Sequence, residues 1–376
     1  MNDSKYIIPK RWQRVIASLV DTFLKIIPIK KRNLPVKINK ILLIKPDHYG
    51  DVLLFTSVFP IIKKRYPNVQ LDIIVGSWAL DILKNNPNLT NIYVLDHFFL
   101  NRLSIKRAAK LISFVKTYSN TLFKVRKQNY DVCILGRCSG LPNLAIFSRL
   151  SKSKFIIGNR VLGLGKLCDY QAPWKDGVSH EVENFLKLLK PLDIEKSNLI
   201  SHLFPTIIDQ EKVSALMTTY DLQEKKFIVI APGAGNVNKM KAISLENWAG
   251  LIDKLGKKNF KIVLCGTHGE QKMHDDLIEL CKKIYHVDNA ILISLAGRLS
   301  ISQLFFLFQK AAYIYTLDSL AVHLAAMTNV PTTAFYLQAN ESKEQFQQRL
   351  QQWRPLRNDI TVITSINEMV ECISDK

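Results

Sequence analysis

The chain has 376 residues, of which 47% are hydrophobic and 22% charged. This length is enough for two domains with separate cores, and this balance is typical of a globular protein rather than a disordered one. No run reaches the roughly 20 consecutive apolar residues that a membrane-spanning helix needs. The formal net charge is +20, and proteins this basic bind nucleic acid, anionic membranes or phosphorylated substrates.

The basic charge is concentrated at the N-terminus, where residues 1–40 contain ten Lys or Arg and two Asp. Apolar residues recur there at three- and four-residue steps over 9–27, which predicts an amphipathic helix. Two interpretations of the extension, residues 1–38, stay open: a helix lying in the headgroups of an anionic membrane, or a helix packed on the first domain. Asp21 and Lys25 interrupt the apolar run, which argues against a secretory signal. We therefore expect a cytoplasmic protein, peripheral on the inner face of the cytoplasmic membrane under the first interpretation.

The six cysteines are scattered, and none forms a Cys-x-x-Cys pair. This spacing argues against a zinc ribbon or a thioredoxin-like site and favours buried or free thiols in a reducing compartment. A His-Glu-x-x-His motif and a Walker loop are also absent from the sequence. We therefore predict no metal site and no cofactor.

From residue 39 onward, apolar strands alternate with helical stretches, which predicts parallel sheets with helices on both faces. Strands are expected at 40–45, 71–75, 92–95, 131–135 and 154–157, and then at 227–231, 260–265, 291–294, 313–316 and 331–335. Helices are expected at 51–65, 78–85, 104–127, 142–150 and 179–190, and then at 244–257, 269–284, 300–310, 319–328 and 366–374. Residues 191–210 are predicted to link the two α/β halves, so the domains are 39–200 and 201–376.

The first of these strands ends in a short turn from Lys45 to Gly50, and Asp51 opens the helix that follows. Ligands bind at the carboxyl ends of strands in open α/β sheets. The Asp51 carboxylate can cap the helix by accepting its first amides, or it can act as a general base. Local sequence alone favours the cap.

Three segments, in this order, resemble signatures of the heptosyltransferase family, which is glycosyltransferase family 9. The resemblance is to its ADP-heptose:lipopolysaccharide heptosyltransferases. They are ILLIKPDHYGDVL at 41–53, IVIAPGAGN at 228–236 and LDSLAVHLAA at 317–326. The resemblance extends from about residue 39 to the C-terminus. It implies the α/β GT-B architecture, with two Rossmann-like domains facing a central cleft. It also implies that the C-terminal domain binds the nucleotide sugar and that the last helix packs back on the first domain.

The resemblance implies an inverting, metal-independent glycosyltransferase in lipopolysaccharide biosynthesis. Its donor would be ADP-heptose, and its acceptor an anionic glycolipid, the lipopolysaccharide core. One alternative is a relative that uses another nucleotide sugar in surface polysaccharide assembly. Another is a non-catalytic member that binds a glycolipid without turnover. For nucleic acid, we expect only nonspecific, salt-dependent binding, because the sequence has no nucleic-acid motif.

By the same resemblance, Asp51 is the catalytic base, with Asp47 as the rival carboxylate. Lys45 and His48, from the turn, are expected to bind the acceptor. The residues expected to bind the donor are Gly233, Gly235, Lys241, Glu270, Asp318, Ser319 and His323. In this set the glycines let backbone amides approach a phosphate, and Glu270 holds a ribose hydroxyl.

Several of these donor assignments have alternatives. Lys239 can replace Lys241 at the diphosphate, and His323 can instead be a buried, hydrogen-bonded helix residue. The chain also departs from the family pattern at two places. Residues 242–244 read Ala-Ile-Ser where the family has Arg-Trp-Pro, and Leu320 stands where a glycine is usual. Both departures raise the alternative in which the donor sugar differs, and Leu320 also argues for the non-catalytic alternative.

Overall fold

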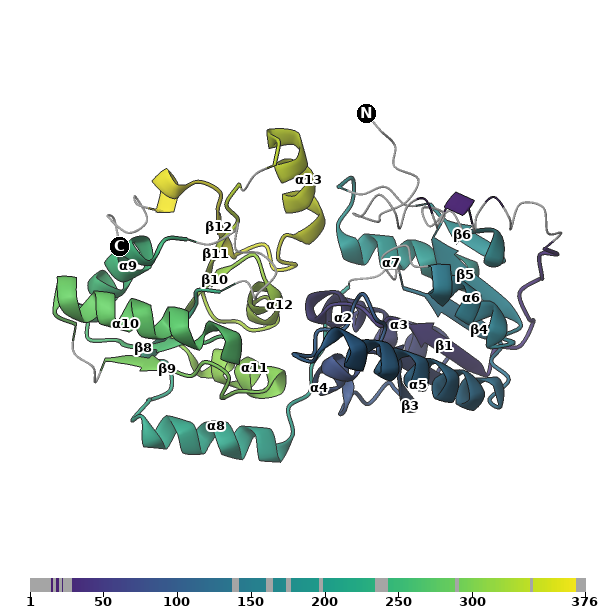
Figure 1. Ribbon diagram of the computed structural model, residues 1–376, viewed down its shortest axis with the longest axis horizontal. Coiled ribbons are helices and arrows are strands. Elements are labelled where there is room, and N and C mark those ends of the chain that lie inside the picture. Colours follow the sequence, from purple (N-terminus) through teal and green to yellow (C-terminus); the bar gives the residue numbers. More distant parts are fainter. Residues whose placement is uncertain are drawn as a thin grey trace. The chain divides into compact units, whose positions relative to one another are not determined.

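A computed structural model of the protein describes residues 15, 18, 19, 22, 29–136, 142–159, 165–173, 177–195, 199–233, 243–287, 291–338 and 341–369. The chain divides into two compact units, unit 1 from Met1 to His202 and unit 2 from Leu203 to Lys376. Each unit has one six-stranded sheet with flanking helices (Figure 1). In the described residues, no helix is long and apolar enough to cross a membrane.

The sheet of unit 1 has the strand order β3-β2-β1-β4-β5-β6, and all its neighbouring strands are parallel. Its strands are β1 (Lys40–Ile44), β2 (Gln70–Val75), β3 (Asn91–Val94), β4 (Val132–Leu135), β5 (Phe155–Asn159) and β6 (Tyr170–Ala172). The central strands are runs of buried Val, Ile and Leu, because helices cover both faces of a parallel sheet. The three-residue strand β6 was not predicted from the sequence.

The helices of unit 1 are α2 (Tyr49–Phe55), α3 (Val58–Arg65), α4 (Leu80–Leu83), α5 (Arg107–Arg126), α6 (Pro142–Leu150) and α7 (Glu181–Leu189). The single helix predicted over 51–65 is wrong, because α2 and α3 are separated at Thr56 and Ser57. The hydroxyls of these two residues donate back to the carbonyl oxygens of Leu53 and Leu54, both at 2.7 Å. Hydroxyls that bond the preceding turn in this way favour bends in helices.

The segment before β1 is attached to unit 1 by Arg32. Its guanidinium Nη2 lies 2.7 Å from Asp169 Oδ2, and the Asp169 side chain is fully buried. Arg149 also lies 3.2 Å from this carboxylate. Upstream of residue 29 only four residues are described; Val15 and Leu19 are helical and more than half exposed, and the rest of the predicted helix over 9–27 lies outside the described residues.

Unit 2 repeats the arrangement, with the parallel strand order β12-β11-β10-β7-β8-β9. Its strands are β7 (Phe227–Ala231), β8 (Lys261–Leu264), β9 (Leu292–Ser294), β10 (Tyr313–Leu317), β11 (Thr332–Phe335) and β12 (Thr361–Ile363). Its helices are α8 (Ile207–Thr219), α9 (Leu245–Gly256), α10 (Gln271–Tyr285), α11 (Ile301–Lys310), α12 (Leu320–Ala325) and α13 (Lys343–Trp353).

Three of these elements, β12, α8 and α13, were not predicted, and α8 corrects the expected linker. That linker was expected over 191–210, but α8 begins at Ile207, where Thr206 and Asp209 form a reciprocal capping box. Residues 366–369 are helical, and Met369 is buried in the core of unit 2. Residues 370–376 lie outside the described residues, so packing of the last helix on the first domain stays a prediction.

Four of the cysteines, Cys133, Cys168, Cys265 and Cys281, are buried free thiols, which confirms the sequence-based interpretation for the described ones. Burial raises the pKa of Cys281 to about 11, so its thiol is protonated at neutral pH. These side chains therefore belong to the packed cores.

In both units the first strand lies beside the fourth, which makes the gap between them the point where the strand order reverses. These switch points lie between β1 and β4 in unit 1 and between β7 and β10 in unit 2. Open α/β sheets bind ligands in the crevice at such a point, beyond the carboxyl ends of the strands. All three family-like segments pass through these strand ends.

Candidate functional site

Asp51 lies in the first turn of α2, just beyond the carboxyl end of β1. The helix begins at Tyr49 with His48 as its N-cap residue, so Asp51 is its third residue. The interpretation of Asp51 as the cap residue is therefore wrong. Its carboxylate Oδ1 lies 3.8 Å from the Lys45 ammonium, and its side chain is 17% exposed.

Lys45 is fully buried, and its ammonium lies between two carboxylates. Its Nζ is 3.1 Å from Asp47 Oδ2 and 3.8 Å from Asp51 Oδ1. The ammonium also lies over the Phe185 ring, 5.1 Å from the ring centroid. A buried charge needs such partners because desolvation is costly. This burial favours a role for Lys45 in holding the two carboxylates rather than in reaching an acceptor at the surface.

The two carboxylates differ in their access to solvent and in their partners. The Asp47 side chain is only 3% exposed; Oδ2 accepts from Lys45, and Oδ1 accepts from the His48 backbone N–H at 3.0 Å. Burial alone would raise the pKa of Asp47, but the Lys45 ammonium and these hydrogen bonds hold it below its ordinary value. Asp47 is thus a buried anion with both oxygens bonded, and Asp51 is the more exposed carboxylate.

His48 is held by Arg102, whose Nε donates to His48 Nδ1 at 2.9 Å. Burial, helped by the charges of Arg102 and Lys45, lowers the pKa of His48 to about 4, although Asp47 acts in the opposite direction. His48 is therefore neutral at neutral pH. Arg102 was not predicted from the sequence, because it lies 54 positions beyond His48 and has no local signal.

In unit 2, Gly233 lies just beyond β7 and directly against the carboxylate of Glu270. A Cβ atom on residue 233 would lie 1.9 Å from Glu270 Oε1, so only glycine fits here without moving that carboxylate. Glu270 Oε2 accepts from the Thr267 N–H at 2.6 Å and from its hydroxyl at 2.9 Å. The structure thus brings together two of the residues predicted to bind the donor. Gly235, Lys241 and the alternative Lys239 lie outside the described residues.

Beneath this carboxylate lies His274, which the sequence analysis did not identify. Its side chain is fully buried, and its Nδ1 is 2.9 Å from Ser294 Oγ. A Cβ atom on Gly266 would lie 3.0 Å from His274 Nε2 and 2.9 Å from Glu270 Oε2, so the two groups approach the same backbone. Burial lowers the pKa of His274, which favours a neutral ring. Within the described residues, Nε2 has no hydrogen-bond partner.

Asp318, at the end of β10, is bonded to Arg349 of α13. The Arg349 guanidinium also donates to Glu341, from Nη2 at 2.7 Å, and to the Leu337 carbonyl oxygen at 3.0 Å. Burial alone would lower the pKa of Arg349, but Glu341 and Asp318 raise it above its ordinary value. The Asp318 carboxylate is therefore already paired within unit 2. Sequence reasoning missed Arg349 because α13 itself was not predicted.

Ser319 is the N-cap residue of α12, and its hydroxyl accepts from the Ala321 N–H at 3.3 Å. Leu320 is the first residue of this helix and has helical backbone, so the position does not require the left-handed conformations that favour glycine. His323 is 6% exposed within the same helix. Its burial agrees with the alternative interpretation, a packed helix residue, and its role toward a donor stays a prediction.

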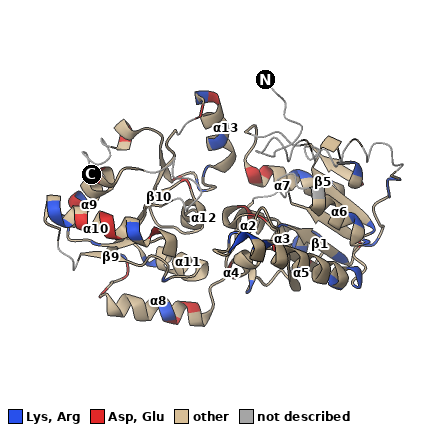
Figure 2. Ribbon diagram, in the orientation of Figure 1, with Lys and Arg blue, Asp and Glu red and all other residues tan. Residues whose placement is uncertain are grey.

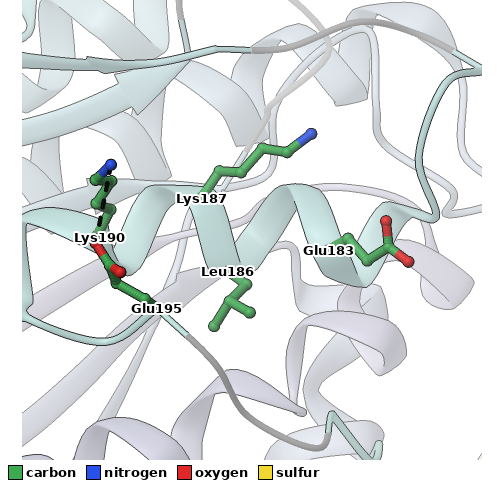
Figure 3. Close-up of a pocket in the computed structure, with 5 residues that line it drawn as sticks. All are labelled: Glu183, Leu186, Lys187, Lys190 and Glu195. Carbon is green, nitrogen blue, oxygen red and sulfur yellow. Dashed lines mark ion pairs between the residues drawn. The ribbon is translucent and has the colours of Figure 1, made fainter.

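A shallow hollow on unit 1 lies away from these residues, along α7 (Figure 3). Its lining residues are Glu183, Leu186, Lys187, Lys190 and Glu195. Lys187 donates to Asn184 Oδ1 at 2.8 Å, and Lys190 lies 3.8 Å from Glu195. The two acidic and two basic residues balance in charge, and none of the predicted site residues lines the hollow. We therefore place the candidate site at the strand ends.

Solved structures resemble this fold over most of its length. The structure of E. coli ADP-heptose lps heptosyltransferase II has a TM-score of 0.68 at 17% identity, covering 89% of this chain and 98% of that one. E. coli heptosyltransferase WaaC with ADP has a TM-score of 0.64 at 15% identity, covering 89% of this chain and 99% of that one. The fold is α/β of the GT-B class, with two Rossmann-like domains.

The sequence comparisons agree with this fold. Lipopolysaccharide heptosyltransferase 3 of Escherichia coli is 23% identical over 304 residues, covering 77% of this chain and 80% of that one. The model of the family described as glycosyltransferase family 9 (heptosyltransferase) matches residues 121–375, more than half of the chain. The chain therefore belongs to glycosyltransferase family 9, the heptosyltransferase family, and is a glycosyltransferase.

Proposed function

We propose that this glycosyltransferase moves heptose from ADP-heptose to the core of lipopolysaccharide, without a metal ion and with inversion at the anomeric carbon. The family membership supports a nucleotide-sugar donor and a glycolipid acceptor. The observation that carries the proposal is Asp51, a partly exposed carboxylate at the switch point of unit 1. A base at this place can take the proton of an acceptor hydroxyl.

In the proposed reaction, the acceptor oxygen attacks the anomeric carbon while its proton passes to Asp51. The bond from that carbon to the diphosphate oxygen breaks, and its electron pair leaves with ADP. Asp51 fits the role of base better than Asp47, because both Asp47 oxygens already accept hydrogen bonds and its side chain is nearly inaccessible. Lys45 keeps the pair of carboxylates in place and moderates their mutual repulsion.

We assign donor binding to unit 2, at the ends of β7 and β10. Gly233 and Gly235 would let the backbone approach the diphosphate, and Lys241 would neutralise the charge that develops as ADP leaves. Glu270 would accept from a ribose hydroxyl, because its Oε1 lies against the Gly233 backbone. Ser319 and His323 would contact the sugar or phosphate, while Asp318 acts through Arg349 by fixing this edge of the sheet.

For the acceptor, we propose contact with His48 and with Arg102, which add a neutral imidazole and a guanidinium beside the two carboxylates. A guanidinium suits an anionic acceptor because it pairs well with carboxylate and phosphate groups. Since such an acceptor is lipid-linked, we propose that the protein works in the cytoplasm at the inner face of the cytoplasmic membrane.

The test is to incubate the purified full chain with ADP-heptose and a deep-rough lipopolysaccharide and to measure released ADP. Asp51→Asn should lower kcat/KM by about 10²- to 10⁴-fold, the usual contribution of a general base. ADP affinity, measured by calorimetry, should be nearly unchanged. Asp81→Asn is the matched control, because Asp81 is also a first-turn carboxylate paired with a lysine, at 2.7 Å from Lys84.

Each part of the proposal can fail separately. An active Asp51→Asn enzyme would remove Asp51 as the base while leaving the reaction intact. Turnover of another nucleotide sugar in place of ADP-heptose would correct the donor. Acceptor binding without turnover of any nucleotide sugar would indicate a non-catalytic member of the family.

A further inference from the structure

Helix α5 is apolar on two opposite faces, although only one of them packs against unit 1. Its inner face contributes Phe114, Tyr118, Leu122 and the fully buried Val125 to the core that covers β1 and β4. On the opposite face, three large apolar side chains point to solvent. Ile112 is 67% exposed, Val115 59% and Phe123 62%.

These outward residues lie along one stripe, because positions 112, 115, 119 and 123 recur at three- and four-residue steps. The polar Ser119 occupies the position between Val115 and Phe123. An amphipathic helix on a globular domain normally presents polar residues on its outer side. Several large apolar side chains left in water on one side of a helix indicate an interaction surface. We use the name α5 outer face for Ile112, Val115 and Phe123 together with the basic residues beside them, which are Lys116, Lys124, Arg126 and Lys127.

The charged residues of this helix all have one sign. The 20 residues of α5 contain five Lys or Arg and no Asp or Glu, and Figure 2 shows blue segments and no red along it. Lys127, which follows the helix, lies over the Phe123 ring at 3.9 Å from its centroid. Among the described residues, no carboxylate pairs with Lys116, Lys124, Arg126 or Lys127. The basic charge next to the apolar stripe is therefore not neutralised.

Helix α8 of unit 2 provides the contrast. Ile207 and Ile208 at its start are also exposed, at 73% and 62%. Acidic residues lie close to them in the chain, however, with Asp209 in the same first turn and Glu211 in the next turn. Exposed aliphatic residues alone thus occur elsewhere on the protein, and the combination with unopposed basic charge is what distinguishes α5.

We propose that the α5 outer face docks the protein on an anionic lipid bilayer. Ile112, Val115 and Phe123 would enter the boundary between headgroups and acyl chains, and the basic side chains would bind lipid phosphates. A bilayer fits these observations better than a protein partner. Flexible lysines beside exposed apolar side chains suit a surface that offers negative charge without a fixed shape.

The position of the surface along the chain connects it to the candidate site. The connection from β3 into α5 also contains Arg102, which bonds His48 beside the two carboxylates. Docking through α5 would thus hold this connection at the membrane where a lipid-linked acceptor resides. The inference draws on the proposed function for that acceptor alone, and its test measures binding without turnover.

The test is co-sedimentation of the full chain with phosphatidylcholine vesicles that contain or lack one quarter phosphatidylglycerol. The variant Ile112→Ser/Val115→Ser/Phe123→Ser should bind the anionic vesicles about tenfold more weakly than the wild type, because it loses most of the inserted area. The control Ile207→Ser/Ile208→Ser should bind as the wild type does. A second variant, Lys116→Gln/Lys124→Gln, should also bind more weakly and should show a shallower dependence on salt.

Circular dichroism and ADP binding that match the wild type would show that the variants are folded. Equal vesicle binding by the triple variant and the wild type would overturn the proposal, because the binding surface would then lie elsewhere on the chain. Wild-type protein that does not bind the anionic vesicles would also overturn it. Equal binding to both kinds of vesicle would refute the electrostatic part.

Discussion

Each unit holds one cation between two carboxylates at the ends of its central strands, but the two clusters differ in solvent access. In unit 1 the Lys45 side chain has no exposed surface, and its nearer partner Asp47 is 3% exposed. In unit 2 the Arg349 side chain is 16% exposed, with Asp318 at 9% and Glu341 at 20%. Both cations lie over aromatic rings, but the guanidinium fork also donates to three separate acceptors.

The difference suggests separate tasks for the two clusters. A buried lysine beside two carboxylates fixes their charge and position, which suits a site where a proton is exchanged. An arginine with several bonds fixes backbone and loop geometry, which suits a site that holds a ligand in place. The free-energy consequences differ as well, since removing a partner from a fully buried pair leaves an uncompensated charge.

The largest effect is expected from Lys45→Met, which leaves Asp47 buried without its cation. The free energy of unfolding of unit 1 should fall by about 3–5 kcal/mol. Hydrogen-exchange mass spectrometry can measure this loss for each unit, because the exchange of β1 peptides reports on unit 1 and that of β10 peptides on unit 2. Lys154→Met is the matched control: its side chain is 60% exposed and pairs with Asp131, so a loss of less than about 1 kcal/mol is expected. Equal losses in the two variants would contradict the contrast in burial.

Acid should act strongly on unit 1 through His97, which is fully buried. Burial lowers its pKa to about 4, against 6.5 for the ordinary side chain, so the folded state favours the neutral ring. The unfolded chain therefore binds more protons as the pH falls. The contribution of His97 to the free energy of unfolding is fully present above about pH 6.5. It is lost as the pH falls from about 6.5 to about 4, and the loss is on the order of 3 kcal/mol in total.

This pH dependence can be checked by urea unfolding of wild type and His97→Gln at a series of pH values. The variant should be less stable at pH 7, because the contact with Asn143 changes, but its stability should fall less steeply below pH 6.5. Parallel curves for the two proteins would show that other groups are responsible.

A smaller effect is expected from Arg349→Lys in unit 2. The lysine keeps the charge but cannot reproduce the fork that bonds Glu341, Asp318 and the Leu337 carbonyl oxygen. The free energy of unfolding of unit 2 should fall by about 1–2 kcal/mol, with weaker protection of β10 peptides in hydrogen exchange. If Arg349→Lys lowered the free energy of unfolding more than Lys45→Met does, the more buried cluster of unit 1 would not be the one that is more sensitive to loss of its cation.

The smallest effect on stability is expected from Gly233→Ala, which forces the Glu270 carboxylate to move. We expect about tenfold weaker ADP binding by calorimetry, equivalent to about 1.4 kcal/mol. The control is Gly250→Ala in the interior of α9, where the nearest atom to a new Cβ is Tyr285 Oη at 3.7 Å. That change should leave ADP binding unaltered and stabilise unit 2 by about 0.5–1 kcal/mol. Unchanged ADP affinity in Gly233→Ala would remove Gly233 and Glu270 from the donor site.

Much of the fold follows from the sequence because its central strands are continuous runs of Ile, Val and Leu. β1, β7 and β10 were therefore found with nearly their observed bounds. The short outer strands β6 and β12 lack such runs and were missed. Helix α8 was missed because it buries only Asp209 and Val213, so its pattern resembles that of a polar segment.

For the site, the sequence located the residues at the strand ends but not their partners. Asp51, Gly233 and Asp318 follow strands, and strand ends can be recognised locally. Arg102 bonds His48 from 54 positions away, and Arg349 bonds Asp318 from 31 positions away, so only the folded chain identifies these two arginines. The burial of Lys45 was equally invisible, because a lysine in a turn is ordinarily exposed.

The Arg32–Asp169 pair determines how the N-terminal extension should be truncated in any experiment. Asp169 is fully buried, and Arg32 supplies one of its two cations. A truncation that ends after residue 32 would remove the amphipathic segment and also leave this carboxylate short of a partner. Reduced membrane binding of such a protein would then have two possible causes, loss of the predicted amphipathic segment and a loosened edge of the sheet. A truncation that ends at residue 28 keeps Arg32, so reduced membrane binding of that protein would report the loss of the removed segment alone.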